Sequence, residues 1–384
     1  MPELPNTLSA KDVDTPALLA EIREWVELET HTPDAAAVSA LAAKVAGRAQ
    51  AMGFATETLP GIDGKGDMLL VRHGQPTTER KGILILAHLD TVHARGSLAG
   101  PLPWRVEGDR IWGPGIYDMK AGACMALEAL RLARDTGNGP PLPVTIMYVP
   151  DEETGSESAR ARIEAEANRA AVALVVEPAR DGGKIVVARK GVAMFDITAT
   201  GRASHAGTHP QNGRSAIREA ARVVLALEAL NDPARGITVT VGTITGGTGR
   251  NTIPAECRMQ VDLRLPDAEA AREVLAAVEA LAPSDPDIAL TIEGGMNRPA
   301  FTQTEAARAV FDTARSIAAD LGIDLVGMAT GGGSDGNFTA ALGVPTLDGL
   351  GVDGAGAHTF DEHILVSSLA PRTALLANLL LTLE

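Results

Sequence analysis

Aromatic residues, cysteines and positive charge are all scarce in this sequence. Aromatic residues make up 3% of the 384 residues, and 34 Lys and Arg face 49 Asp and Glu, which gives a net charge of −15. A chain this acidic, without a basic stripe or interleaved aromatic residues, is not expected to bind nucleic acid or an anionic membrane surface. The two cysteines, Cys124 and Cys257, are too few for a disulfide framework, so we expect both to be small buried side chains.

Long apolar segments are also missing. No apolar run approaches the roughly 20 residues that span a bilayer, so we expect no transmembrane helix. Residues 1–14 have neither the basic start nor the apolar centre of a signal peptide. These two observations predict a cytoplasmic protein.

Three short apolar segments, each followed at once by potential metal ligands, are the most informative feature of the chain. Residues 82–87 precede His88 and Asp90, residues 144–150 precede Glu152 and Glu153, and residues 173–176 precede Glu177. Short continuous apolar runs are typical of strands buried on both faces, as in a parallel sheet. Ligand sites in such sheets lie beyond the carboxyl ends of the strands, so we expect these side chains to meet at one edge.

Strands alternate with helical segments over the first half of the chain, which predicts an α/β fold with a mostly parallel sheet. From about residue 191 the pattern becomes the order β-α-β-β-α-β of a ferredoxin-like unit, and apolar and polar residues alternate between 256 and 265. The α/β pattern resumes with a helix from residue 304. We therefore predict a catalytic domain formed by residues 1–190 and 300–384, interrupted by an inserted α+β lid or dimerisation domain at 191–299.

The side chains at the strand ends suit a centre that holds divalent metal and activates water. His88 and Asp90 lie two apart on a strand and share a face, where Asp90 can orient the imidazole directly or through the backbone. Asp118 follows a Gly-Pro-Gly turn, and its two oxygens can bridge two cations. Glu152 and Glu153 are adjacent and should point in different directions, so that one binds metal while the other acts as general base.

Each of these features alone has a plainer interpretation: a turn, a helix cap or a solvated acidic surface. Their convergence at three strand ends favours a functional site. So many carboxylates at one point would raise each other's pKa, and divalent cations would relieve that repulsion.

The motifs of the chain resemble those of the di-zinc peptidase family that contains glutamate carboxypeptidase, acetylornithine deacetylase, succinyl-diaminopimelate desuccinylase and aminoacylase. They are HLDTV from His88, WGPGIYDMKAG from Trp112, PDEETGS from Pro150, VVEP from Val175, SHAGTHPQNGRSAI from Ser204, GGTGRNTIPAEC from Gly246, TGGGSD from Thr330 and GAGAHTFDE from Gly354. The resemblance extends from about residue 14 to the C-terminus and is greatest to the glutamate carboxypeptidase branch.

This resemblance implies two zinc ions per subunit, which Co²⁺ or Mn²⁺ can replace in such a mixed ligand set. The implied ligands are His88 and Glu177 for one ion, Glu153 and His358 for the other, and Asp118 as the bridge. Asp90 would lie behind His88, and Glu152 would be the general base. Spacing alone does not single out His358, which lies in a Gly-rich loop.

Further roles that the resemblance implies fall outside the cluster. His205 would reach the active site of a partner subunit and stabilise the oxyanion, in a homodimer formed through the lid domain. Asn251 and Arg264 would contact substrate, with the planar guanidinium of Arg264 binding a carboxylate by two hydrogen bonds. Gly332 and Gly333 would let the backbone approach the substrate closely.

The predicted function is a zinc-dependent carboxypeptidase that releases C-terminal glutamate from small peptidyl or N-acyl substrates. Lys184 matches a basic residue that binds the glutamate side chain in the resembling enzymes, across a one-residue length difference. If Lys184 is only a solvated loop residue, an N-acyl amino acid deacylase is an equal alternative. A zinc-bearing binding protein without activity would have no need of Glu152. A glycosidase needs only two carboxylates and would leave the histidines without a role.

Overall fold

The structure, a computed structural model, describes residues 7–77 and 79–384, so part of the segment on which the signal-peptide prediction rests lies outside the described residues. Contacts divide the chain into two compact units. Unit 1 comprises Met1–Ala188, Gln303–Ala329 and Ser334–Glu384, and unit 2 comprises Arg189–Thr302 and Thr330–Gly333. Unit 2 therefore includes a short segment around the Gly331–Gly333 run as well as the inserted stretch.

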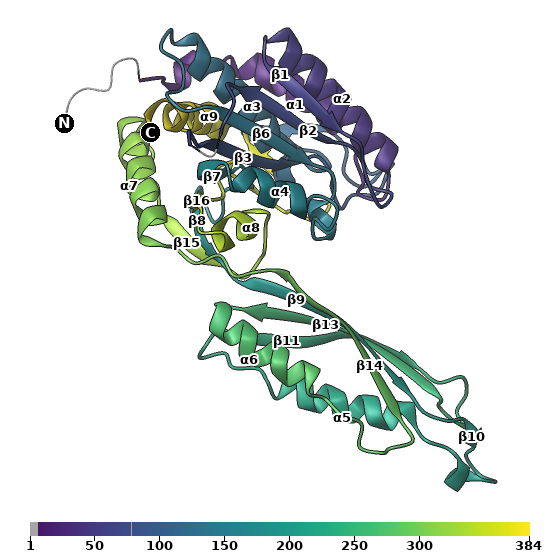
Figure 1. The fold of residues 1–384 in the computed structure, drawn as a ribbon. Coiled ribbons are helices and arrows are strands. Elements are labelled where there is room, and N and C mark those ends of the chain that lie inside the picture. The colour runs from purple at the N-terminus through teal and green to yellow at the C-terminus, as the bar shows by residue number, and fades with distance from the viewer. Residues whose placement is uncertain (1–6, 78) are drawn as a thin grey trace. The chain divides into compact units, whose positions relative to one another are not determined.

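The helices of unit 1 surround a central sheet (Figure 1). They are α1 (Thr15–Val26), α2 (Ala35–Ala51), α3 (Ala121–Asp135), α4 (Arg160–Ala167), α7 (Glu305–Asp320), α8 (Gly336–Ala341) and α9 (Val366–Thr382). The sheet strands are β1 (Ala55–Leu59), β2 (Met68–His73), β3 (Gly82–His88), β6 (Val144–Val149), β7 (Ala170–Val175) and β16 (Thr346–Leu347). Helices α1, α2 and α7 begin at a capping side chain; at the start of α2, for example, Asp34 accepts a hydrogen bond from the amide of Ala37 at 3.1 Å.

The sheet order is β1-β2-β6-β3-β7-β16. Strand β3 pairs in parallel with β6 and β7, and β16 pairs in parallel with β7, whereas β1 and β2 are antiparallel additions at one edge. The predicted α/β fold with a mostly parallel sheet is confirmed.

The central strand β3 is apolar up to Ala87 because both of its faces are buried. Ile83 and Ile85 pack into a core with α1, α2, α3 and α9, while Leu84 and Leu86 pack into a second core with α4 and α8. These helices cover opposite faces of the sheet in Figure 1. Cys124 is buried in the first of these cores, as the sequence predicts.

Two smaller sheets of unit 1 have no clear sequence signal, because their strands are short and lie in turn-rich segments. One has the order β17-β18-β5-β4 and carries the C-terminal part of the site; the other pairs β15 with β8. Their bounds are β4 (Arg105–Glu107), β5 (Arg110–Trp112), β8 (Ile185–Arg189), β15 (Gly327–Thr330), β17 (Gly354–Ala355) and β18 (His363–Leu365).

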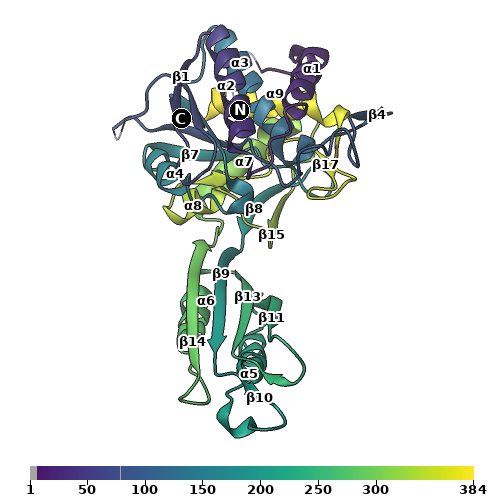
Figure 2. The same ribbon diagram turned by 90° about the vertical axis from the view of Figure 1, so that its right-hand side faces the viewer.

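Unit 2 has the element order β-α-β-β-α-β around a four-stranded sheet. The elements are β9 (Gly191–Thr200), α5 (Ala216–Glu228), β11 (Thr238–Gly246), β13 (Glu256–Leu265), α6 (Ala268–Glu279) and β14 (Ala289–Arg298), with the short strands β10 (Ser204–His205) and β12 (Thr252–Ile253). Figure 2 shows the strands in the order β14, β9, β13, β11, and each pair is antiparallel.

Strand β13 has one face buried and one face in water. Cys257, Met259, Val261, Leu263 and Leu265 are buried in a core with α5 and α6, and the residues between them are exposed or half-buried. The predicted alternation is therefore present. Asp267 caps α6, because its carboxylate accepts the amide hydrogen of Ala270 at 2.8 Å. No described helix combines the length and the apolar character that a membrane crossing requires.

Candidate metal centre

The carboxyl ends of β3, β6 and β7 bring the first predicted ligands together in unit 1. His88 is the last residue of β3, and Glu177 lies two residues beyond the end of β7. Beyond β6 the chain turns into a single 3₁₀ turn, Glu152–Thr154. Because β3 is parallel to both neighbours, all three ends face the same edge of the sheet.

His88 is buried and is held from both sides. Its Nδ1 lies 2.9 Å from the backbone carbonyl oxygen of Asp90 and 3.4 Å from a carboxylate oxygen of the same residue. The backbone contact is the shorter of the two, and it fixes the ring so that Nε2 faces the carboxylates of Asp118 at 3.2 Å and Glu177 at 3.7 Å. Nε2 is therefore the atom available to a metal.

Asp118 lies between the two histidines. One of its oxygens is 3.2 Å from His88 Nε2 and the other is 3.5 Å from His358 Nε2. The preceding turn needs glycine at Gly115, which has φ 69°, and a Cβ there would lie 2.3 Å from Cγ2 of Thr91. A carboxylate with its two oxygens directed at two different imidazoles has the geometry of a bridge between two cations.

His358 comes from the Gly-rich loop between β17 and β18. Its backbone has φ 63°, the left-handed conformation that non-glycine residues rarely adopt. In this conformation Nε2 lies 3.1 Å from Oε2 of Glu153 as well as near Asp118. The structure thus brings His358 to the strand-end cluster, although nothing in its local sequence spacing indicates this position.

Asp90 organises the Glu152–Glu153 turn. Its two carboxylate oxygens accept the amide hydrogens of Glu152 and Glu153, each at 3.2 Å, and one also accepts the hydroxyl hydrogen of Thr32 at 2.8 Å. Asp90 is fully buried. It therefore supports His88 through its backbone and the acidic turn through its side chain.

The donor atoms form two overlapping groups in which all atoms lie within 4.8 Å of one another. One group is His88, Glu152 and Glu177; the other is His88, Asp118 and Glu153. Imidazole nitrogen and carboxylate oxygen are ligands that zinc accepts. Oε1 of Glu153 is also buried without a hydrogen-bond partner among the described residues, which a cation would supply. The residues present thus fit a divalent metal.

The pKa values reflect this concentration of charge. Burial, followed by the charge of Asp118, raises the pKa of Glu177 well above its usual value, and burial also raises the pKa of Glu153. Hydrogen bonds to Asp118 and Glu153 raise the pKa of His358 to about 10. Burial opposes a charge on His88, but hydrogen bonds to Asp118 and Asp90 outweigh it and raise the pKa of that imidazole. The carboxylates thus attract positive charge to the cluster.

Lys120 is a buried cation near the cluster. It is fully buried, and its Nζ has no hydrogen-bond partner among the described residues. Burial lowers its pKa to about 7, although the carboxylates of Glu362, Glu29 and Asp90 act in the opposite direction.

The predicted substrate residues lie elsewhere, and only Lys184 belongs to unit 1. Lys184 follows the Glu177 loop and pairs through its backbone with Arg180, with hydrogen bonds of 2.7 and 2.8 Å. Gly332 and Gly333, in unit 2, direct their carbonyl oxygens at the guanidinium of Arg189. Arg264, on β13, makes two hydrogen bonds of 2.8 Å to the carboxylate of Asp262.

His205 and Asn251 are neighbours in unit 2. Strand β10, which ends at His205, pairs with β12, and the amide of Ala206 donates to the carbonyl oxygen of Asn251 at 2.9 Å. Nδ1 of His205 accepts hydrogen bonds from the amides of Gly207 at 3.1 Å and Thr208 at 3.0 Å. An Nδ1 that accepts two N–H groups carries no proton, so the neutral ring has its hydrogen on Nε2.

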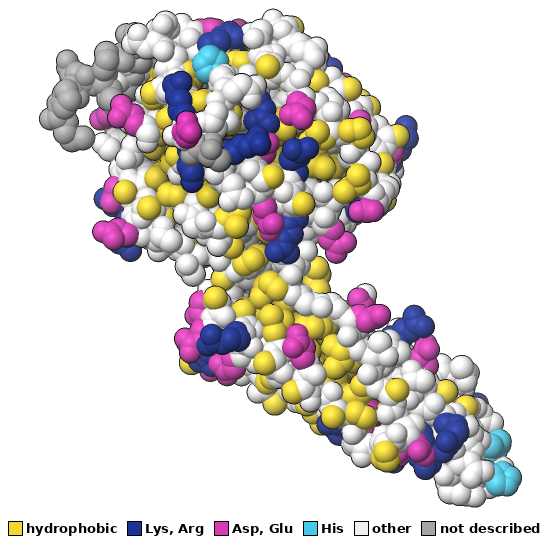
Figure 3. All heavy atoms as spheres, viewed as in Figure 1, with side chains coloured by type: hydrophobic (Ala, Val, Ile, Leu, Met, Phe, Trp, Pro, Cys, Tyr) yellow, Lys and Arg dark blue, Asp and Glu magenta, His cyan; other side chains and the backbone are white. Residues whose placement is uncertain are grey.

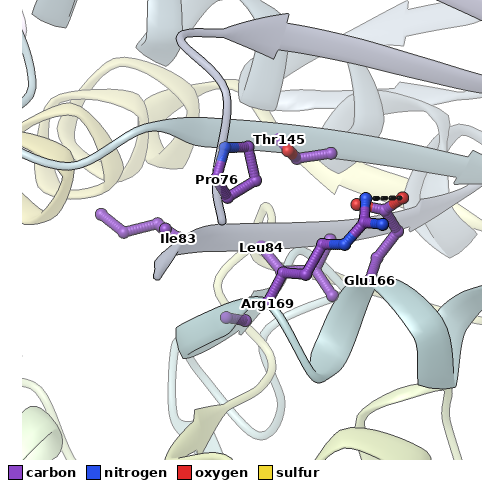
Figure 4. A pocket seen from close by; sticks show the side chains of 8 residues that line it. Pro76, Ile83, Leu84, Thr145, Glu166 and Arg169 are labelled. Carbon is purple, nitrogen blue, oxygen red and sulfur yellow. Dashed lines mark ion pairs between the residues drawn. The ribbon is translucent and has the colours of Figure 1, made fainter. Parts of the chain in front are cut away.

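A small cavity lies at the other end of β3 from His88 (Figure 4). It is lined by Pro76, Gly82, Ile83, Leu84, Thr145, Glu166, Arg169 and Ala170, and none of the predicted site residues is among these. Glu166 forms a buried ion pair with Arg72 at 2.9 Å. This cavity is separate from the candidate metal centre.

Three residues that contribute to the cluster were not predicted from the sequence: Thr32, His93 and Glu362. Thr32 donates to Asp90, whereas His93 and the backbone of the Asp118 loop donate to Glu362. Glu362 lies within the GAGAHTFDE motif, and His93 directly follows the HLDTV motif, so their positions could have drawn attention to them. No sequence signal marks Thr32.

Comparisons with known proteins agree with this geometry. The model of peptidase family M20/M25/M40 matches residues 84–382. The chain is 32% identical over 382 residues to carboxypeptidase G2 of Pseudomonas sp. (strain RS-16), covering 96% of this chain and 90% of that protein. It is 29% identical over 267 residues to acetylornithine deacetylase of Myxococcus xanthus, covering 65% and 67% of the two chains.

Solved structures share the fold. Aminopeptidase PepT from Bacillus cereus ATCC 10987 has a TM-score of 0.75 at 24% identity, covering 96% of this chain and 98% of that one. The M20 family metallo-carboxypeptidase Sso-CP2 from Sulfolobus solfataricus has a TM-score of 0.74 at 16% identity, covering 94% and 98%. The expectation of a metallohydrolase is confirmed, and the chain belongs to peptidase family M20/M25/M40.

Proposed function

We propose that the protein is a di-zinc carboxypeptidase that releases C-terminal glutamate, or a similar acidic residue, from small peptidyl or N-acyl substrates. The observation that carries this proposal is the position of Asp118, with one oxygen near His88 and the other near His358. This arrangement supports two metal ions: His88 and Glu177 would hold the first, and Glu153 and His358 would hold the second. Co²⁺ or Mn²⁺ would fit the same ligands.

The reaction assigned to this centre is hydrolysis of an amide bond. When bound, the metal ions lower the pKa of the attacking water and polarise the carbonyl group. Glu152 takes the proton from that water and later transfers it to the departing amine. Asp90 supports this role because it accepts the amide hydrogen of Glu152 at 3.2 Å and so fixes the backbone from which the base projects.

His205 is proposed to stabilise the oxyanion in the active site of a partner subunit. The amide hydrogens of Gly207 and Thr208 occupy Nδ1, so Nε2 of the neutral ring is a donor. His205 is exposed, which supports a role outside its own unit. Asn251, whose backbone pairs with Ala206 beside it, is proposed to contact substrate from the same loop.

Specificity for an acidic residue is proposed to come from the loop after Glu177. Arg180 and Lys184 form a hydrogen-bonded antiparallel pair, so their side chains emerge on the same face of the loop. Nε of Arg180 is buried and has no hydrogen-bond partner among the described residues. Tyr117, next to Asp118, donates its hydroxyl hydrogen to the carbonyl oxygen of Ala179, which holds this loop beside the ligands. Two cations on one face suit a carboxylate.

Arg264 is proposed as a second carboxylate contact, together with close backbone approach at Gly332 and Gly333. Its guanidinium already makes two hydrogen bonds to Asp262, so a substrate carboxylate would have to replace that partner.

An N-acyl amino acid deacylase is the second candidate function, supported by the 29% identity to an acetylornithine deacetylase. The same metal centre serves both reactions.

A homodimer formed through unit 2 is part of the proposal, and a cytoplasmic location remains a prediction. Figure 3 shows hydrophobic side chains among the charged ones on the visible surface. The large exposed hydrophobic residues of unit 2 are Met194, Ile217, Leu225 and Ile244. Exposed apolar residues on a small unit support an interface.

The test is hydrolysis of a substrate panel by metal-free protein with and without added zinc. The panel contains N-acyl glutamates, N-acetyl and N-succinyl amino acids, and dipeptides. We expect zinc to restore glutamate release, and we expect Arg180→Ala and Lys184→Ala each to raise KM for glutamate-ended substrates while leaving neutral ones unchanged. Arg95→Ala, which removes an exposed cation of unit 1, is the control.

Release of acyl groups alone would assign the protein to the deacylases. An absence of cleavage with zinc bound would contradict the hydrolase proposal. Equal effects of the loop variants on neutral and acidic substrates would remove Arg180 and Lys184 from specificity.

A further inference from the structure

Glu362 is a fully buried carboxylate in the C-terminal segment that also carries His358. Its Oε1 accepts the amide hydrogens of Tyr117 at 2.8 Å and Asp118 at 2.9 Å. Its Oε2 accepts the amide hydrogen of Gly115 at 3.0 Å and lies 2.5 Å from Nε2 of His93, which donates to it. One side chain thus binds three amides of the turn that carries Asp118.

These four donors exclude two other roles for Glu362. A carboxylate offers about four lone-pair positions, and the four hydrogen bonds use them. No position remains for a metal ion or for a proton taken from water. Glu362 is accordingly absent from both groups of donor atoms that could hold a metal.

The Glu362 side chain ties together two segments that each supply a proposed ligand. The strand after it, β18, pairs with β5 just before the Asp118 turn, with His363 opposite Trp112. His358 precedes Glu362 in the same segment, and it faces the carboxylate oxygen of Asp118 that is not directed at His88. A shift of the turn would therefore move Asp118 relative to both histidines.

We propose that Glu362, oriented by His93, is a positioning residue that sets metal affinity by fixing where the Asp118 carboxylate lies. This inference rests on the proposed metal centre. Residues that orient metal ligands typically change affinity or activity by roughly 10–100-fold when they are replaced. Glu362 acts less directly, because it binds the backbone amides of the turn that carries Asp118. The hydrogen bond from His93 holds the Glu362 carboxylate in place.

The experiment measures zinc affinity separately from stability. Zinc dissociation constants are determined on metal-free protein by competition with a chromogenic chelator, and unfolding in urea is followed on the same metal-free samples. In Glu362→Gln the amide NH₂ group faces backbone N–H donors, so we expect zinc affinity to fall roughly 10–100-fold. The control is Glu166→Gln, which removes a buried carboxylate from the ion pair with Arg72 at the other end of β3. We expect this control to lose stability and keep wild-type zinc affinity.

A second pair of variants keeps the test decisive if Glu362→Gln does not fold. His93→Phe removes the donor to Oε2 and should weaken zinc binding, whereas His93→Gln retains a donor and should restore much of the affinity. Unchanged zinc affinity in His93→Phe, or an equal loss in Glu166→Gln, would overturn the positioning role. Wild-type protein that binds no zinc would instead contradict the proposed function, and the inference would fall with it.

Discussion

Thr32 donates its hydroxyl hydrogen to the carboxylate of Asp90 at 2.8 Å, across 58 positions of the chain. Both residues are buried. Asp90 also accepts the amide hydrogens of Glu152 and Glu153, so the Thr32 hydroxyl completes the set of donors that orients this carboxylate.

Replacing Thr32 by Val should lower turnover while the protein stays folded. Loss of one hydrogen bond to a buried carboxylate costs about 1–3 kcal/mol and loosens the support of the Glu152 turn, so we expect kcat to fall roughly 10-fold. The measurement is kcat on the best substrate of the panel together with urea unfolding. Thr30→Val is the control, because Thr30 is also buried but donates to the backbone carbonyl of Leu89. Equal loss of kcat in both variants would show a general effect of destabilisation.

Replacing Glu152 by Gln should nearly abolish turnover and leave the metal content unchanged. A positioned general base typically contributes roughly 10²–10⁴-fold to the rate, and glutamine cannot take a proton. Metal content is measured by elemental analysis alongside kcat. Because Glu152 groups with His88 and Glu177 at ligand distances, loss of metal from the variant would identify it as a ligand rather than the base.

Replacing His205 by Ala should lower kcat by roughly 10²–10³-fold, the usual cost of one oxyanion donor, while zinc content stays constant. His209→Ala is the matched control, because His209 is an exposed histidine of the same loop whose amide donates to the His205 carbonyl oxygen. Full turnover in His205→Ala would exclude this residue from the mechanism.

The Glu21–Arg48 pair predicts a pH effect away from the metal centre. Burial raises the pKa of Glu21 despite the ion pair with Arg48 at 3.1 Å. Folding therefore favours the protonated form of Glu21. The stability that this preference contributes is fully present below the unfolded-state pKa of Glu21 and is lost as pH rises through its folded-state pKa. Glu21→Gln should thus become more stable relative to wild type between about pH 4.5 and pH 7.5, by less than about 1 kcal/mol. Urea unfolding of metal-free proteins at both pH values measures this, and a trend of opposite sign would show that the ion pair outweighs burial.

The strand-end half of the site could be predicted because burial on both faces leaves a signal in the sequence. Residues 82–87 are apolar since β3 supplies two separate cores, and the first polar residue, His88, marks the edge where the chemistry begins. The same logic located Glu177 after β7. The apolar run of each strand was sufficient to locate these two residues, because burial of a strand constrains neighbouring residues of the same segment.

The rest of the site has no such signal. His358 and Glu362 lie around strands of two and three residues, too short for any periodicity, and their positions depend on pairing with β5. His358 was identified only through the family resemblance. The pairing of Arg264 with Asp262 was missed as well, although two residues spaced two apart on a strand share a face.

The hydrogen bond between His93 and Glu362 joins positions 269 residues apart. A nascent chain in which His88, Asp118 and Glu177 have already been synthesised still lacks His358, the fifth proposed ligand. It also lacks Glu362, whose carboxylate holds the turn that carries Asp118. Contacts between such distant segments form late, because their loop-closure entropy is paid before they contribute stability. Metal loading in the cell is thus expected to wait for synthesis of the segment that carries His358 and Glu362, and a polypeptide that stops before this segment would present an open half-site for zinc.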